Sequence, residues 1–163
     1  MIRKATSEDF LATVDIYNQA IVHRCTGDTQ SLTAQERTPW FEQRNNPRTP
    51  IYVYESGGKV VAYGYIASYR YGRPAFAGVG EVAYYVDFCH HRKGIGNQML
   101  EFLISQARTI GYGHLVAILL GSNEKSISLL RKYGFALWGD MPGVAVIDGV
   151  RHSHVYYGRE LLD

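Results

Sequence analysis

The sequence, 163 residues long, has few of the features that mark secreted, membrane-spanning or nucleic-acid-binding proteins. It contains two cysteines, Cys25 and Cys89, and no Cys-x-x-Cys pair or apolar leader, which makes the cytoplasm the expected location. No apolar run approaches the roughly 18 residues that a membrane-spanning helix needs. With 17 basic and 15 acidic residues, the formal charge of +2 is too small to favour nucleic acid or an acidic membrane as a partner.

Proline and low-complexity sequence are also scarce, so the chain offers no candidate linker. Five prolines are spread along it, and no internal repeat is found. The length is typical of one domain, residues 1–163, and hydrophobic residues make up 46% of the composition, enough for a core without a disulfide or metal. Thirteen tyrosines indicate half-buried strands or an aromatic-lined pocket.

Hydrophobic periodicity predicts an alternation of strands and helices. Strands are expected at residues 2–5, 51–55, 59–69, 80–86, 115–120, 135–138 and 154–162. Helices are expected from the N-cap Thr6 to about residue 23, from the capping box of Thr33 and Glu36 with a disturbance at Pro39, from 95 to 110, and from Ser122 or Asn123 to 132. The order β-α-α-β-β-β-α-β-α-β-β indicates a layered α+β structure.

A glycine-containing turn between a predicted strand and a predicted helix is the strongest local signal. Residues 91–96 read His-Arg-Lys-Gly-Ile-Gly. Glycine lets the backbone approach a ligand, a helix start offers unpaired N–H groups, and Arg92 and Lys93 add positive charge. A plain tight turn is the alternative, but the basic pair, the strand and the amphipathic helix together favour a pyrophosphate-binding turn.

Two other patterns are interpreted as non-functional. Residues 78–83 match a dinucleotide-binding fingerprint, but residues 84–86 continue as a strand where that motif needs a helix. Residues 90–91 are both histidine, as are 152 and 154, yet no nearby cysteine or carboxylate completes a tetrahedral site, so no metal is expected.

Three stretches together resemble the GNAT acyl-CoA N-acyltransferases. They are the strand ending at residues 82–86, the turn and helix that follow it, and residues 123–135, which are similar to the pattern N-x-x-[A/S]-x-x-L-(aromatic)-x-x-x-G-F. Residues 16–20, 40–44 and 141–142 are similar to the phosphinothricin-type amino-acid N-acetyltransferase branch. The resemblance implies an α+β fold with a central mixed, mostly antiparallel sheet and helices on both faces.

The resemblance further implies that acetyl-CoA binds where the strand at residues 80–86 parts from the strand at 115–120. The diphosphate would lie on the backbone amides of residues 92–97, and amides near Tyr85 and Val86 would hold the thioester carbonyl. Asn123 would hydrogen-bond the pantetheine arm, helped by Ser126. The implied cofactor-binding residues are Tyr84, Tyr85, Val86, Arg92, Lys93, Gly94, Ile95, Gly96, Asn97, Asn123 and Ser126.

On the acceptor side, the resemblance implies that Glu81 is the general base, directly or through water, because an alkylammonium must lose a proton before it attacks a thioester. A surface carboxylate is the alternative interpretation. The acceptor-contact segment falls at Arg73, Pro74, Ala75 and Phe76. Arg70 or Arg73 could hold a substrate carboxylate, although a solvated loop fits equally. The implied reaction is acetyl transfer to a primary amine of a small amino acid or analogue, such as phosphinothricin or methionine sulfoximine.

Two positions depart from the family pattern. His91 stands where the family has Gln or Arg, which a cradle made of backbone amides tolerates. Leu130 stands where many members carry an aromatic hydroxyl that protonates the departing thiolate, and Tyr133, three residues on, is on another side of the helix. Water can serve instead, because a thiolate is a tolerable leaving group near neutral pH. Cys89 is expected to be a small buried residue and not a nucleophile.

Two other functions are compatible with the same sequence. One is a non-catalytic acyl-CoA-binding or sensing module, because a fold does not fix an activity. The other is a protein or peptide N-acetyltransferase, which needs an open groove. Thiol release from acetyl-CoA with a panel of amines would discriminate between them. The branch resemblance and an aromatic-rich surface also predict a homodimer.

Overall fold

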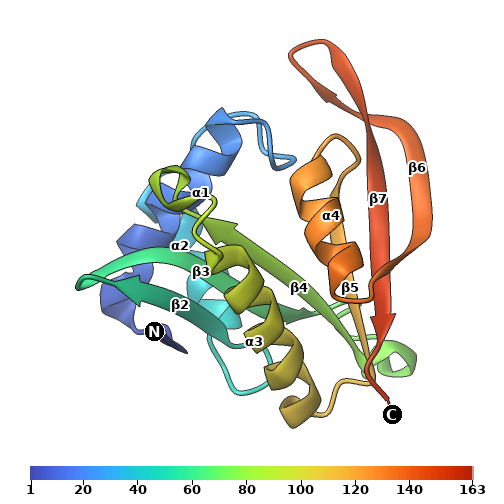
Figure 1. Cartoon of the computed structure of the whole chain (residues 1–163), viewed down its shortest axis with the longest axis horizontal. Helices are drawn as coiled ribbons and strands as arrows, with labels where there is room; N and C mark the ends of the chain where they lie inside the picture. The colour runs from blue at the N-terminus through green and yellow to red at the C-terminus, as the bar shows by residue number, and fades with distance from the viewer. Residues whose placement is uncertain (163) are drawn as a thin grey trace.

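One mixed sheet forms the centre of the computed structural model, which describes residues 1–162 (Figure 1). Its seven strands are β1 (Ile2–Lys4), β2 (Ile51–Ser56), β3 (Lys59–Ser68), β4 (Val79–Val86), β5 (His114–Leu120), β6 (Ala136–Ile147) and β7 (Val150–Glu160). They lie in the order β1-β2-β3-β4-β5-β7-β6, and each neighbouring pair is antiparallel except β4 and β5. The predicted α+β class with a mostly antiparallel sheet is confirmed.

The helices begin and end close to the predicted residues. They are α1 (Phe10–Val22), α2 (Ala34–Arg44), α3 (Ile95–Ile110) and α4 (Glu124–Lys132), with 3-10 turns η1 (Ser7–Asp9), η2 (Pro74–Phe76) and η3 (Phe88–His90). At the start of α2, the Glu36 N–H donates to Thr33 Oγ1 at 3.2 Å and the Thr33 N–H donates to Glu36 Oε2 at 2.7 Å, which is the predicted capping box. The predicted disturbance at Pro39 does not end α2, which continues to Arg44.

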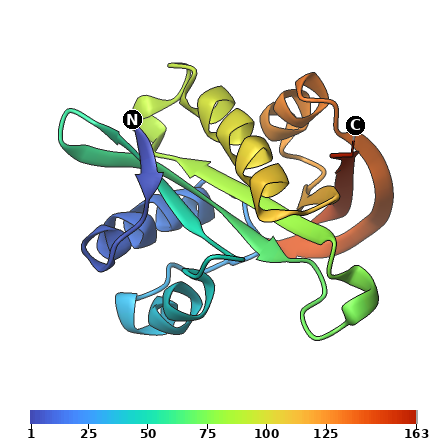
Figure 2. The ribbon, with the colours of Figure 1, turned by 90° about the horizontal axis from the view of Figure 1, so that it is seen from below.

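The helices cover both faces of the sheet, α1 and α2 on one and α3 and α4 on the other (Figure 2). Because side chains alternate along a strand, β4 contributes to both cores. Val82 and Tyr84 pack with residues of α3 and α4, whereas Ala83 and Tyr85 pack with residues of α1 and α2. Glu81 lies two residues before Ala83, so its side chain is on the α1 and α2 face.

The parallel pair of β4 and β5 is short. Only Val79–Glu81 of β4 pair with residues 114–116 of β5, although both strands continue beyond this point. On its other side β4 stays paired with β3 as far as Val86. The two strands therefore diverge after Glu81, as the sequence predicted, and leave a gap in the middle of the sheet.

The C-terminal hairpin is longer than predicted. Strands expected at 135–138 and 154–162 are in fact β6 and β7, which meet at a turn of Asp148 and Gly149 with φ values of 51° and 79°. Two central residues with positive φ are typical of a type I′ hairpin, and Asp-Gly is a strong sequence signal for it. The prediction was wrong here because it did not use that signal.

Candidate active site

The turn between β4 and α3 presents a row of unpaired backbone N–H groups. Among the described residues, the N–H groups of residues 92–97 donate to no backbone acceptor. Gly94 has a φ of 76°, a conformation that favours glycine, and a Cβ built on it would meet no atom within 4 Å. Free N–H groups at a helix N-terminus, with open space above them, fit a diphosphate.

Gly96 has a different environment from Gly94. A Cβ at Gly96 would lie 3.4 Å from a methyl group of Leu129, so this glycine permits close packing of α3 against α4. Asn97 is on the same turn, and its Oδ1 accepts a hydrogen bond from Lys132 Nζ at 2.6 Å. The end of α4 is therefore tied to the start of α3.

Side chains from α1 and from the turn fix the end of β4. Gln19 Nε2 donates to Asp87 Oδ2 at 2.9 Å, and the Phe88 N–H donates to Gln19 Oε1 at 2.8 Å. The hydrogen bond from Gln19 is the main reason that the pKa of Asp87 is lowered. His91 Nε2 lies 2.9 Å from the Val86 carbonyl oxygen. His91 thus holds the turn against β4, and the phosphate site itself is left to the backbone.

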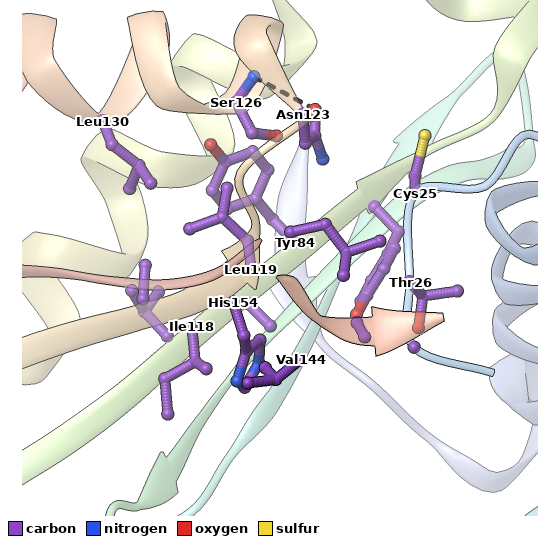
Figure 3. Close-up of a pocket in the computed structure, with 17 residues that line it drawn as sticks. Cys25, Thr26, Tyr84, Ile118, Leu119, Asn123, Ser126, Leu130, Val144 and His154 are labelled. Carbon is purple, nitrogen blue, oxygen red and sulfur yellow. Dashed lines mark hydrogen bonds between the residues drawn. The ribbon is translucent and has the colours of Figure 1, made fainter. Parts of the chain in front are cut away.

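A cavity of about 270 Å³ lies where β4 and β5 diverge (Figure 3). Residues 82–85 of β4 line one wall, residues 117–120 of β5 line another, and Asn123, Ser126 and Leu130 line the α4 side. We call it the donor cavity. It brings together Tyr84, Tyr85, Asn123 and Ser126, which the sequence singled out.

Several lining residues of the donor cavity were not identified from the sequence. They are Cys25, Thr26 and Gly27 from the loop after α1, Ile118 of β5, and Val144, Ala145 and His154 from the C-terminal hairpin. Arg24 Nε donates to Asp148 Oδ2 at 2.6 Å, which connects that loop to the hairpin tip. Recognition of Asp148-Gly149 as a hairpin turn would have brought Val144, Ala145 and His154 near one another.

The hydrogen-bond register of β4 determines which backbone groups face the donor cavity. The Asp87 N–H donates to the Val61 carbonyl at 2.9 Å, so the odd-numbered residues of β4 bond to β3. The even-numbered residues present their N–H and C=O groups to the β5 side. The N–H groups of Tyr84 and Val86 therefore face the gap, whereas that of Tyr85 does not. Of the amides predicted near Tyr85 and Val86, the register therefore leaves those of Val86 and of the neighbouring Tyr84 free to face the gap.

The α4 wall offers an amide but no phenol. Asn123 Oδ1 accepts the Ser126 N–H at 3.4 Å as the helix cap, so Ser122 is not the cap and the side-chain NH₂ of Asn123 is left to donate to a ligand. Leu130 is buried, and Tyr133 does not line the cavity. The Tyr84 hydroxyl is buried without a hydrogen-bond partner among the described residues, and burial raises its pKa to about 12.

Glu81 is not itself among the residues that line either cavity, but it directly precedes Val82, which lines the donor cavity, and it lies beside a second cavity of about 870 Å³. Ala67, directly opposite Glu81 on β3, lines the second cavity, and such cross-strand neighbours have Cβ atoms about 4.5–5.5 Å apart on the same face. Burial raises the pKa of Glu81, and the positive charge of Arg44 opposes this shift. A carboxylate with a raised pKa is suited to accept a proton from an ammonium group.

The second cavity, which we call the acceptor cavity, contains the segment that the sequence assigned to substrate. Arg73, Pro74 and Phe76 line it, and Ala75 belongs to the same 3-10 turn, η2. The opposite wall is formed by the end of α2 and the residues after it, including Arg44 and Arg48. Arg48 Nη2 donates to the Ala77 carbonyl at 2.5 Å and links the two walls.

The remaining predictions concern features other than these two cavities. Cys89 is exposed on η3, not buried as predicted, because the 3-10 turn projects from the end of β4. Within residues 1–162, no three His, Cys, Asp or Glu side chains gather in an arrangement that could hold a metal ion. No helix in the described part of the chain has the length and apolar character needed to cross a membrane.

The diverging strands, the turn with its free N–H groups and the half-buried glutamate of raised pKa fit an enzyme that takes an acyl group from a coenzyme A thioester. The chain matches the model of the Acetyltransferase (GNAT) family over residues 16–135 and belongs to that family. It is an acetyl-CoA-dependent N-acetyltransferase, and the fold and family predicted from the sequence are confirmed.

Two named relatives and one solved structure are similar to this chain over most of its length. YwnH of Bacillus subtilis (strain 168), whose name refers to phosphinothricin acetyl transfer, is 38% identical over 162 residues and covers 98% of both chains. The L-methionine sulfoximine/L-methionine sulfone acetyltransferase of Salmonella typhimurium is 32% identical over 146 residues, which are 89% of this chain and 85% of that one. The structure of yncA from Salmonella typhimurium with acetyl-CoA has a TM-score of 0.92 at 30% identity, covering 100% of this chain and 94% of that one.

Proposed function

We propose that the enzyme acetylates the primary amine of a small amino acid or analogue, with Glu81 as the general base. The observation that carries this proposal is that the immediate neighbours of Glu81 line both cavities, Val82 the donor cavity and the cross-strand residue Ala67 the acceptor cavity. The Glu81 carboxylate takes a proton from the ammonium group, directly or through water. The free amine attacks the thioester carbonyl carbon, the C–S bond breaks, and coenzyme A leaves as its thiolate, which takes up, directly or through water, the second proton that the nitrogen loses as the amide forms.

The backbone positions the donor. The diphosphate lies on the N–H groups of residues 92–97, with the charges of Arg92 and Lys93 beside it, and the Asn123 NH₂ holds the pantetheine arm near Ser126. The free N–H groups of Tyr84 and Val86 support this assignment, since they can donate to pantetheine or to the developing oxyanion. The thiolate leaves without a phenol from α4, because its pKa is close to the cysteine value of about 8.5.

Light scattering tests the finer proposal that the protein is a homodimer. In support, β6 is the edge strand of the sheet and exposes Leu137, Trp138, Val144 and Val146. A long apolar edge strand is a liability unless another surface covers it. A protein of the 18.4 kDa monomer mass at micromolar concentration would contradict the proposal.

Steady-state thiol release tests the proposed reaction. Acetyl-CoA is mixed with amino acids, methionine sulfoximine, phosphinothricin, polyamines and short peptides, and released thiol is measured with and without each amine. Turnover with a free amino acid or analogue is the expected result. Binding of acetyl-CoA without turnover would favour a non-catalytic module, and turnover of peptides alone would favour a peptide N-acetyltransferase.

A further inference from the structure

The charged side chains that line the acceptor cavity are positive. Four arginines line it, Arg44 and Arg48 on the α2 side and Arg70 and Arg73 on the loop that contains η2. Among the described residues no aspartate or glutamate lines it. Clefts lined by one sign of charge concentrate ligands of the opposite sign. This charge stands out in a chain with a formal net charge of only +2.

Arg44 is placed differently from the other three arginines. It is half-buried in the last turn of α2, its guanidinium carbon lies 5.5 Å from the centre of the Tyr65 ring, and it acts electrostatically on Glu81. Within residues 1–162 it forms no salt bridge with a carboxylate. A guanidinium that lies beside an aromatic ring and forms no salt bridge among the described residues is well placed to bind a carboxylate or related anion.

Arg48 has internal partners that Arg44 lacks. Besides its hydrogen bond to the Ala77 carbonyl, its guanidinium carbon lies 4.7 Å from the centre of the Tyr112 ring. It therefore shapes the wall of the cavity. Arg44 on this side, and Arg70 and Arg73 on the facing loop, are left to meet a ligand.

The position of Glu81 orients the acceptor. An amine that gives its proton to Glu81 lies at the boundary of the two cavities, so the rest of the acceptor extends past Ala67 into the acceptor cavity. A simple amino acid brings one carboxylate, which one wall can satisfy. Guanidinium groups on both walls are complementary to an acceptor with two anionic groups.

We propose that this enzyme selects amino-acid acceptors that carry a second anionic group, a carboxylate or a phosphinate, and that Arg44 determines this selectivity. The inference rests on the proposed acetylation of amino acids at Glu81. It adds the charge of the preferred acceptor and the residue that recognises it. Neutral amino acids of the same shape bind less well, because they leave Arg44 desolvated without an anion.

Acceptor pairs matched in shape and different in charge test the inference. The pairs are glutamate with glutamine, aspartate with asparagine, and phosphinothricin with methionine sulfoximine. A hydrogen bond to a charged group is worth enough for a difference of about 10- to 150-fold. We expect kcat/KM of the wild-type enzyme to be higher by about that factor for the anionic member of at least one pair, with most of the difference in KM.

The variant Arg44→Gln removes the charge and keeps a polar side chain. It should lower kcat/KM for the anionic acceptor at least about tenfold and leave the value for its neutral partner within about threefold, so that the preference disappears. Arg151→Gln, which removes an exposed arginine on β7 outside the acceptor cavity, is the control and should keep the preference. An equal loss for both acceptors would show that Arg44 acts structurally and would overturn the inference.

The inference and the proposed function fail in different ways. If the enzyme turns over amino acids without a charge preference, or prefers the neutral members, the inference is wrong and the proposed function stands. If no amino acid is turned over, the proposed function is wrong. Calorimetry of the same pairs with the coenzyme A-saturated protein then decides the inference, because selective binding of the diacids would support it and its absence would overturn it.

Discussion

The two cavities on either side of Glu81 are built from different parts of the chain. The donor cavity presents backbone N–H groups, from residues 92–97 at the start of α3 and from Tyr84 and Val86 on β4. The acceptor cavity presents side chains, chiefly arginines on a loop and at a helix end. The backbone N–H groups of the donor cavity could be provided by many different sequences. The properties of the acceptor cavity depend on which side chains are present.

This difference explains which substitutions the site tolerates. His91 and Leu130 depart from the family pattern on the donor side, and neither removes a backbone donor. His91 instead lies against the Val86 carbonyl, and Leu130 fills the α3 and α4 core. On the acceptor side a single change of side chain would alter the charge that meets the substrate. Donor binding should therefore be general across relatives, and acceptor choice should be specific to each chain.

The largest expected effect comes from the group between the cavities. Glu81→Gln should lower kcat by about 10²–10⁴-fold and leave acetyl-CoA affinity nearly unchanged, because the base acts in the transition state. The loss should shrink as pH rises and free amine becomes available. Steady-state kinetics from pH 6 to 10 check this expectation. Glu101→Gln, on the exposed side of α3, is the control. A Glu81→Gln enzyme with wild-type kcat at pH 7 would remove Glu81 from the mechanism.

The backbone cradle is tested by a bulky side chain at Gly94. Gly94→Val should weaken acetyl-CoA binding about 10- to 100-fold, because the side chain fills the space above the free N–H groups and disturbs the turn. Calorimetry measures the affinity. Gly57→Val is a matched control, since Gly57 has a φ of 57° and open space around it in a distant hairpin. Equal loss of affinity in both variants would mean that strain alone is responsible.

The pH dependence of kcat/KM links the two cavities. Because burial raises the pKa of Glu81, the acid limb should lie above the ordinary glutamate value of 4.5, and activity should fall as pH decreases through it. Arg44 lowers that pKa, so Arg44→Gln should move the limb to higher pH, measured with a neutral acceptor. An unchanged limb would contradict the electrostatic contact between Arg44 and Glu81.

The smallest expected effect concerns stability on the donor side. Tyr84→Phe removes a buried hydroxyl that has no hydrogen-bond partner among residues 1–162, so the free energy of unfolding should stay constant or rise by up to about 1 kcal/mol. Tyr112→Phe removes a hydrogen bond of 3.0 Å to the Arg48 carbonyl and should lower the free energy of unfolding by about 1 kcal/mol. Urea unfolding measures both. A clear loss for Tyr84→Phe would indicate an additional partner for its hydroxyl.

The sequence predicted the parts of the molecule that depend on local chemistry. Gly94 and Gly111 mark the ends of α3, and Thr33 with Glu36 marks the start of α2, because these residues satisfy or replace backbone groups within one turn. Non-local features could not be read in this way. The contact of Arg24 with Asp148 spans 124 residues, and Arg44 lowers the pKa of Glu81 only because α2 packs on β3 and β4.

The gap between β4 and β5 has a consequence for how the protein responds to heating. Three residue pairs join the two strands, and past them the N–H groups of Tyr84 and Val86 have no backbone partner among the described residues. A molecule bound across the gap stabilises the folded state alone, so the melting temperature becomes a measure of occupancy. At a hundred times the dissociation constant, the added free energy of unfolding is about 2.7 kcal/mol. A thermal-shift screen of acyl-CoA thioesters of increasing chain length can therefore rank acyl donors before any acceptor is known.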